Sequence, residues 1–284
     1  MRERYHGLVD QQQAASQGAL SRKTVLITGA SSGIGAAFAD VFAAHGFDLI
    51  LVARREDRLR EVAARLEREH HVRAEVIVSD LSDPEAPSRL CAQIAERGLA
   101  VDALVNNAGY GVSGSYLDSP WATHRAMLQV MVVAMADLTH RLLPGMIARG
   151  YGRVINVSSL AGLVPAPAGH TLYAATKALG VRFSEALSGE VGKFGVHVTA
   201  LCPGFTLSEF HDVTGTREKV STLPKWLWMD ASKVARQGFD AVMAGTPIYI
   251  PGRVNRAIAI LVRVVPMSIV NAVGRRIGKT YRKT

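Results

Sequence analysis

The chain has 284 residues, of which 48% are hydrophobic, so it can bury the core of one large domain or of two small ones. The net charge is +9, but residues 253–284 hold eight Lys and Arg residues and no acid, so the rest of the chain is nearly neutral. No nucleic-acid-binding motif accompanies this charge, which argues against a DNA or RNA partner.

The N-terminal residues and the two cysteines indicate the cellular compartment. Residues 1–21 form a polar arm with charges but no apolar core of a signal peptide, so we expect no secretion signal. Cys91 and Cys202 lie in apolar segments and are typical of core residues in a reducing, cytoplasmic environment rather than of a disulfide framework.

The first predicted element is a buried strand that runs into a glycine-rich turn and a helix. Thr24–Thr28 is β-branched and almost wholly apolar, as in strands buried on both faces of a parallel sheet. Gly29, Gly33 and Gly35 follow, and an Ala-rich helical pattern begins there. This order predicts a phosphate site, because free N–H groups and the helix dipole favour an anion. The glycine spacing differs from the general dinucleotide fingerprint, so a simple turn remains the alternative.

The second predicted strand, Asp48–Val52, leads into the position that selects the cofactor in dinucleotide-binding folds. An acid there holds the ribose hydroxyls, whereas an arginine accommodates a 2′-phosphate. Ala53 stands where the acid would be, and Arg54 comes next. We therefore predict NADP(H). The alternative is that Arg54 and Arg55 merely begin the charged helix Glu56–Glu69.

The third and fourth predicted strands, Val76–Asp80 and Val101–Val105, also end in residues suited to a site. Asp80 follows the apolar part of the third strand, although it could simply precede a turn. Asn106-Asn-Ala-Gly109 follows the fourth strand, and its two asparagines could be turn chemistry alone.

A fifth strand, Gly152–Val157, is followed by Ser159 and by a helix that holds Tyr173 and Lys177. The last two are four residues apart, so they share one helix face. A tyrosine with a pKa near 10 exchanges protons poorly at neutral pH, and a neighbouring cation lowers that pKa. We therefore expect Lys177 to lower the pKa of Tyr173 for acid–base work, with Ser159 hydrogen-bonding the substrate oxygen.

The remaining predicted strands are Val196–Leu201 and Ile248–Ile250. Pro203, Gly204 and Thr206 follow the first of them. The segment between the two strands includes Trp226, Trp228 and Met229, which are either core residues or an apolar lid over a hydrophobic substrate.

Taken together over residues 22–252, these motifs resemble the short-chain dehydrogenase/reductase family. The resemblance implies that Ser159 polarises a carbonyl, that Tyr173 delivers the proton and that Lys177 holds the nicotinamide ribose and tunes Tyr173, without a metal. It also implies that Asp80 contacts the adenine. The implied cofactor-binding residues are Gly29, Ser31, Ser32, Gly33, Ile34, Gly35, Arg54, Asp80, Leu81, Asn107, Ala108, Gly109, Tyr173, Lys177, Pro203, Gly204 and Thr206. Residues 163–167 and the basic C-terminal segment also resemble the long-chain 3-oxoacyl reductases of this family.

One position departs from the family. Members generally place an asparagine 28 residues before the serine, where it helps to hold a proton-relay water, and this chain has Met131 there. A thioether cannot donate a hydrogen bond. Either the relay uses another group and the enzyme is active, or the protein is a weakly active or inactive NADP(H)-binding sensor or scaffold.

The basic segment 253–284 has two interpretations. Its apolar run Ala257–Val262 is too short to span a bilayer, and on a helix Arg256 and Arg263 share a face opposite apolar residues. That pattern suits peripheral contact with an anionic membrane. The alternative is a helix packed on the domain or on a partner subunit.

We therefore predict a single doubly wound α/β domain over residues 22–252, with a mostly parallel sheet of about seven strands. The predicted protein is a cytoplasmic homo-oligomer, peripheral to a membrane if the basic segment binds lipid. Its predicted activity is NADP(H)-dependent hydride transfer to or from an apolar carbonyl or alcohol, such as a long-chain acyl, steroid-like or aromatic ketone.

Overall fold

The computed structural model describes residues 22–112, 114–166, 168–169, 171–209 and 224–265. Its centre is a seven-stranded sheet of order β3-β2-β1-β4-β5-β6-β9, in which all six neighbouring pairs are parallel. The strands are β1 (Thr24–Thr28), β2 (Asp48–Ala53), β3 (Ala74–Val78), β4 (Ala103–Asn106), β5 (Gly152–Val157), β6 (Val196–Leu201) and β9 (Ile248–Tyr249). The predicted doubly wound fold is thereby confirmed.

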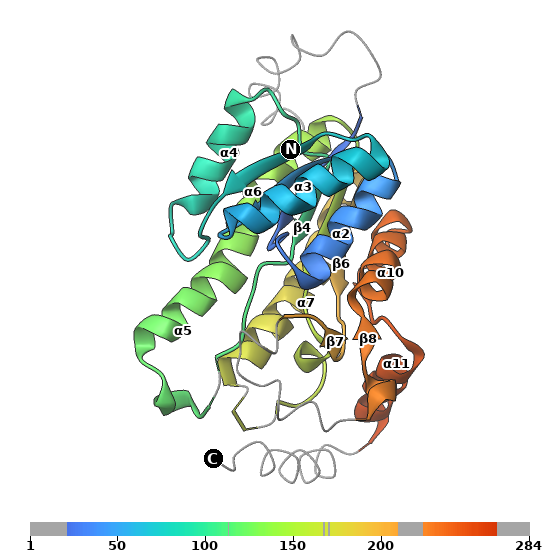
Figure 1. Ribbon diagram of the computed structural model, residues 1–284. Coiled ribbons are helices and arrows are strands. Elements are labelled where there is room, and N and C mark those ends of the chain that lie inside the picture. The colour runs from blue at the N-terminus through green and yellow to red at the C-terminus, as the bar shows by residue number, and fades with distance from the viewer. Residues whose placement is uncertain (1–21, 113, 167, 170, 210–223, 266–284) are drawn as a thin grey trace.

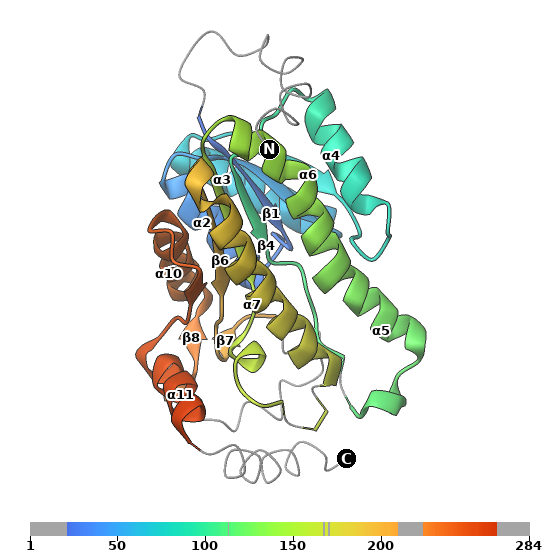
Figure 2. The ribbon, with the colours of Figure 1, turned by 180° about the vertical axis from the view of Figure 1, so that it is seen from behind.

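Helices cover both faces of the sheet (Figures 1 and 2). One face packs against α2, α3 and α10, and the other against α4, the continuous α5–α6 rod and α7. The helices are α2 (Gly33–Ala44), α3 (Glu56–His70), α4 (Ala86–Glu96), α5 (Trp121–Leu128), α6 (Met135–Ala148), α7 (Thr171–Val191), α10 (Ala231–Met243) and α11 (Arg253–Val264). Short 3-10 turns are η2 (Tyr116–Asp118), η4 (Leu160–Gly162), η5 (Gly192–Phe194) and η6 (Lys225–Leu227), and a π-helical turn, η3 (Gln129–Ala134), joins α5 to α6.

The packing of helices on both faces of the sheet explains the apolar run of β1. All five β1 residues are buried. Val25 and Ile27 belong to the core on the α2 side, whereas Leu26 belongs to the core on the α4 side. A strand that is buried on both faces has no polar alternation, which is why its sequence reads as continuously hydrophobic.

Two predicted strands shift by one or two residues. The pairing of β3 begins where Ala74 lies opposite Leu49, and Asp80 leaves the sheet because its carboxylate accepts a hydrogen bond from the Ser82 N–H at 2.9 Å. The pairing of β4 begins at Ala103, later than predicted, and just before it the Asp102 carboxylate accepts a hydrogen bond from the Thr24 N–H at 3.0 Å. Polar side chains at the strand ends thus set boundaries that hydrophobicity alone does not show.

The strand order reverses between β1 and β4. In open α/β sheets such a switch point leaves a crevice outside the carboxyl ends of the strands, where ligands bind. The loops after β1, β4, β5 and β6 all leave the sheet at this edge, and they carry the motifs singled out in the sequence.

The segment 253–284 begins with α11, which packs on the domain. Asn255 and Ala259 are each only 4% exposed, and the Asn255 amide donates a hydrogen bond to the Pro251 carbonyl at 2.8 Å. The first part of the basic segment therefore contacts the domain. The predicted polar arm at residues 1–21 and the remainder of the basic segment beyond Val265 lie outside the described residues.

One stretch of helix among the described residues, Trp121–Ala148, is long and apolar enough to cross a membrane. Its Met127 and Leu138 side chains are buried in the core beside the sheet. Its apolar character therefore reflects packing within the fold.

Candidate active site

The glycine-rich turn after β1 is shaped by backbone geometry that side chains would block. Gly29 and Gly33 have positive φ angles of 67° and 57°, a region that glycine adopts without strain. A Cβ on Gly35 would lie 2.2 Å from the Gly29 carbonyl oxygen. The turn leads directly into the first turn of α2, whose N–H groups have no partner within the helix. Ile34 lies in that first turn. The geometry fits a bound phosphate.

Asn107 braces this turn from the neighbouring strand. Its side-chain amide donates to the carbonyls of Thr28 and Gly29 at 3.0 and 3.2 Å. The Thr28 hydroxyl in turn donates to the Val105 carbonyl and accepts the N–H groups of Asn107 and Ala108. The structure thus brings the motif after β4 against the glycine turn.

Two arginines follow β2. Arg54 was predicted to bind the cofactor, whereas Arg55 was considered only as the start of a helix. Arg54 lies 4.0 Å from the Asp80 carboxylate, and both side chains are largely exposed. Arg55 instead donates to the Ser31 and Ser32 hydroxyls at 3.1 and 2.9 Å. Two adjacent arginines therefore point to different partners, a choice that the sequence does not reveal.

Arg55 also pairs with Glu209 at 2.9 Å, which joins the turn after β7 (Thr206–Leu207) to the glycine turn. The pairing lowers the pKa of the Glu209 carboxyl, with the Arg55 hydrogen bond as the main cause. Leu81, another predicted cofactor residue, is only 6% exposed and packs in the core beside β4.

The predicted catalytic trio comes together at the carboxyl edge of the sheet. Tyr173 and Lys177 share one face of α7, and the Lys177 Nζ lies 5.7 Å from the centre of the Tyr173 ring. Ser159, just after β5, forms a side-chain hydrogen bond with Tyr173. The Lys177 ammonium donates to the Val157 carbonyl at 2.8 Å, which fixes its direction.

The expected effect of Lys177 on Tyr173 is wrong for this structure. Burial raises the pKa of Tyr173 to about 12, and the hydrogen bond from Ser159 opposes this only in part. Burial also lowers the pKa of Lys177 to about 8. Desolvation is the main cause of both pKa shifts, and no effect of Lys177 on the pKa of Tyr173 is among the causes. Tyr173 therefore stays protonated at neutral pH, as a proton donor must.

The segment after β6 lies against the Ser159 loop. The Leu160 N–H donates to the Pro203 carbonyl at 2.8 Å, and the Thr206 hydroxyl donates to the Gly204 carbonyl at 3.2 Å. A Cβ on Gly204 would lie 2.4 Å from the Asn255 side chain of α11, so only glycine fits between them. Pro203, Gly204 and Thr206 thus border the same edge as the trio.

Met131, which stands where the family generally has an asparagine, lies in the π-helical turn η3. It is 5% exposed within the π-helical turn, and its Cγ would be 3.3 Å from a Cβ on Gly109. Met131, Asn106 and Lys177 line one small cavity. The Oδ1 atom of Asn106 is buried and has no hydrogen-bond partner in the described part of the chain.

The three predicted substrate residues do not share one role. Trp226 is 65% exposed. The Trp228 ring packs 5.5 Å from the Phe205 ring, and Met229 forms β8 (Met229–Asp230) beside β7, where its sulfur accepts from the Asn255 amide at 3.6 Å. The core-packing alternative therefore suits Met229 best. Residues 210–223 of the same segment lie outside the described residues.

A second hollow adjoins Tyr173 and includes His124 of α5, a residue that the sequence analysis did not single out. A lone histidine on a helix gives no functional signal in the sequence. Only its burial and its position next to Tyr173 draw attention to it.

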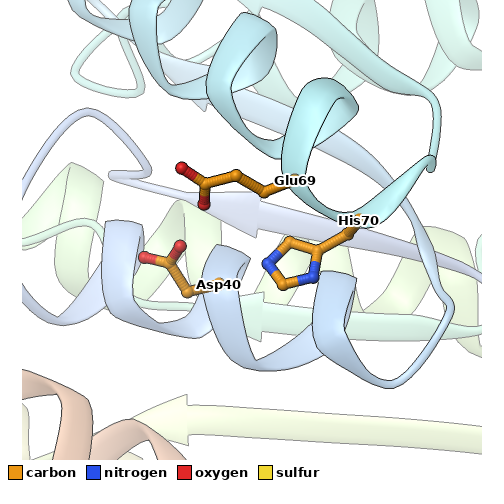
Figure 3. Close-up of side chains that lie close together, drawn as sticks. All are labelled: Asp40, Glu69 and His70. Carbon is orange, nitrogen blue, oxygen red and sulfur yellow. The ribbon is translucent and has the colours of Figure 1, made fainter.

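A cluster of Asp40, Glu69 and His70 lies away from this edge, between α2 and the end of α3 (Figure 3). Their potential ligand atoms lie within 4.8 Å of one another. Arg65 already donates to Asp40 at 2.5 Å and to Glu69 at 3.0 Å, and its own pKa is raised by these hydrogen bonds. The guanidinium occupies the carboxylates that a cation would need, so the cluster holds the two helices together.

Comparisons with known proteins agree with this geometry. A family model described as short chain dehydrogenase matches residues 23–219. Oxidoreductase UcpA of Escherichia coli (strain K12) is 37% identical over 188 residues, which cover 66% of this chain and 71% of that protein.

Two solved structures resemble the whole domain. A short-chain dehydrogenase from Sphingobium yanoikuyae in complex with NADPH has a TM-score of 0.75 at 30% identity, covering 86% of this chain and 96% of that one. The bulky-bulky ketone specific alcohol dehydrogenase from Comamonas testosteroni has a TM-score of 0.70 at 28% identity, covering 87% and 96%.

Proposed function

The chain belongs to the short-chain dehydrogenase family, and on that basis we propose that it transfers a hydride between NADP(H) and the carbonyl or alcohol carbon of a bulky, apolar substrate. The oxidoreductase class and the nicotinamide cofactor follow from membership of the family. The observation that carries the proposal is the convergence of Ser159, Tyr173 and Lys177 at the sheet edge beside the braced glycine turn.

Each member of the trio has a distinct task. The Ser159 hydroxyl hydrogen-bonds the substrate oxygen and aligns it with Tyr173. The phenol, whose pKa is about 12, gives its proton to that oxygen as negative charge develops there. Lys177, whose pKa is about 8, is able to exchange protons near neutral pH and restores the proton of the phenol. When bound, NADP(H) supplies the hydride.

The glycine turn is suited to the pyrophosphate of the cofactor. Gly29 and Gly33 let the backbone approach the phosphates closely, and the amino end of α2 favours their charge. Asn107 and Thr28 keep the turn in place. Arg54 and Arg55 supply positive charge where a 2′-phosphate distinguishes NADP(H) from NAD(H).

The substrate class rests on two observations. Trp226, in the turn η6 just before β8, exposes a large apolar surface. The relative from Comamonas testosteroni is described as specific for bulky-bulky ketones. A steroid-like, aromatic or long-chain acyl ketone fits this character.

The first expected outcome concerns cofactor choice. NADPH should bind at least about tenfold more tightly than NADH, which corresponds to about 1.4 kcal/mol and is modest for a charge-assisted contact. Arg54→Ala should remove most of this preference, as measured by calorimetric titration of both cofactors. Arg58→Ala, in the first turn of α3 and paired with Glu61 at 3.8 Å, is the matched control.

Equal affinity for NADPH and NADH in the natural protein would contradict this prediction. An Arg54→Ala protein that keeps the preference, together with an Arg55→Ala protein that loses it, would transfer the role to Arg55.

The second expected outcome concerns Met131. The natural protein should turn over measurably, and Met131→Asn should be equally fast or faster, because the amide is able to hold a water where the thioether cannot. General acid–base assistance contributes about 10²–10⁴-fold, and a single relay element should contribute less. The gain should appear as a changed solvent deuterium isotope effect on kcat, since proton transfer is the affected step. Met131→Leu is the control of similar size. A slower Met131→Asn enzyme that still binds NADPH normally would refute the prediction.

A second candidate function, contact with anionic lipid, is favoured by the outer side of α11. Ile260, Leu261 and Val264 are 62%, 59% and 72% exposed, and Arg256 is also exposed. Arg256 and these apolar residues share the outer side of α11, while Asn255 and Ala259 face the domain. We propose that this outer side contacts an anionic membrane peripherally.

The lipid contact predicts a specific loss. Replacing Ile260 and Leu261 by serine should weaken binding to phosphatidylserine vesicles by about tenfold or more, because both apolar side chains leave the interface. Co-sedimentation at low and high salt measures it, and Leu179→Ser on α7, 42% exposed, is the control. Unchanged vesicle binding, or a change in oligomeric state instead, would favour packing on a partner subunit.

A further inference from the structure

The second hollow beside Tyr173 contains a buried imidazole whose hydrogen-bonding state is determined by its surroundings. His124 is 5% exposed, and its ring stacks on Tyr116 with centroids 5.1 Å apart and an interplanar angle of 24°. Its Nε2 lies 2.9 Å from the backbone carbonyl oxygen of Tyr116. Because a carbonyl oxygen only accepts, Nε2 carries the hydrogen. In the neutral ring Nδ1 is therefore an acceptor.

This acceptor has no partner within the part of the chain that the structure describes. The Nδ1 atom is buried and makes no hydrogen bond. Buried polar atoms in proteins are usually paired, and an unpaired one calls for an explanation such as a ligand. The stacking on Tyr116 and the bond through Nε2 prevent the ring from turning Nδ1 toward another group.

The hollow connects this acceptor with the catalytic tyrosine. Its cavity volume is about 10 Å³, room for one group of the size of a water or a hydroxyl, and both His124 and Tyr173 line it. Val112, Met127 and Leu172 provide apolar walls. The hollow therefore has room for a single hydroxyl of a substrate held at Tyr173, with the body of that substrate outside it.

We propose that His124 Nδ1 accepts a hydrogen bond from a hydroxyl group of the substrate, remote from the reacting carbon. The inference rests on the proposed function and narrows its substrate class to bulky apolar ketones that carry a second, hydroxyl oxygen. A site built to pair with a hydroxyl rejects the analogue that lacks it, because its own polar atom is then left unpaired.

The test compares cyclohexylcyclohexanone with counterparts that carry a hydroxyl at successive positions of the second ring. In the natural protein with NADPH, at least one hydroxylated ketone should have a kcat/KM about tenfold above that of the parent. His124→Gln keeps a donor for the Tyr116 carbonyl but has no acceptor at the position of Nδ1, since its amide oxygen lies further along the side chain, so the ratio should fall to about one. His124→Asn places an amide atom near the position of Nδ1 and should keep part of the ratio. His140→Gln, at an exposed position of α6, should keep all of it.

Calorimetric binding of the corresponding alcohols to the NADPH-loaded protein separates this inference from the proposed function. Tighter binding of the diol in the natural protein, lost in His124→Gln, supports the subsite even if no ketone is reduced, in which case the proposed function fails. Equal kcat/KM and equal affinity across the series in the natural protein overturn the subsite. A preference for a carboxylate over the hydroxyl that grows as the pH falls also overturns it, because the ring would then act as a cation.

Discussion

Tyr173→Phe should lower the rate of carbonyl reduction by about 10²–10⁴-fold, because it removes the hydroxyl that donates the proton and leaves the ring in place. The phenol is partly buried and desolvation raises its pKa to about 12, so it is protonated at neutral pH. Phenylalanine fills nearly the same volume, and the buried wall around the ring should persist. NADPH affinity should therefore change by less than about twofold, since the lost group acts on the transition state.

The rate is measured in single turnovers with saturating NADPH, which isolates the chemical step from product release. Tyr249→Phe is the matched control, because Tyr249 lies in the edge strand β9 and its hydroxyl donates a 3.4 Å hydrogen bond to Gln237 of α10. If Tyr173→Phe keeps most of the natural rate, another group donates the proton and the assignment of the trio is wrong.

Gly35→Ala should weaken NADPH binding by roughly a hundredfold, because overpacking by one methyl costs about 1–3 kcal/mol and the strain falls on the phosphate turn. The added Cβ would lie 2.2 Å from the Gly29 carbonyl oxygen and 2.6 Å from the Asn107 side-chain nitrogen. Backbone atoms of the turn and its brace would have to move, and the turn could no longer present its N–H groups together.

Gly189→Ala provides the control, since no atom lies within 4 Å of the Cβ it would add. That position is an exposed site on α7, where alanine should stabilise the helix by up to about 1 kcal/mol. Calorimetric titration and thermal unfolding of both variants distinguish a local loss of binding from global unfolding. Natural NADPH affinity in Gly35→Ala would show that the turn does not hold the cofactor.

The fold could be predicted because its signals are local. A buried parallel strand such as β1 needs a continuous apolar run, and the glycine turn must follow it directly for α2 to begin. The spacing of Tyr173 and Lys177 on one helix likewise places both groups in one site. The strand ends were less predictable, because Asp80 and Asp102 form hydrogen bonds that depend on which backbone N–H lies nearby.

The rest of the site depends on contacts between distant segments. Arg55 reaches the glycine turn because Ser31, Ser32 and Glu209 lie within its range, which nothing in its own neighbourhood of the sequence indicates. The pKa of Tyr173 depends on how deeply the ring is buried and on its hydrogen bond with Ser159. His124 becomes noteworthy only once Tyr116 is known to fix its ring.

The most direct test of the central claim is NADPH oxidation by the purified natural protein with a panel of bulky apolar ketones, with product alcohol quantified alongside. The account predicts that at least one ketone is reduced with one alcohol formed per NADPH consumed. A natural protein that binds NADPH but reduces none of them, while Met131→Asn does, would contradict the account and identify the protein as an NADP(H)-binding sensor or scaffold.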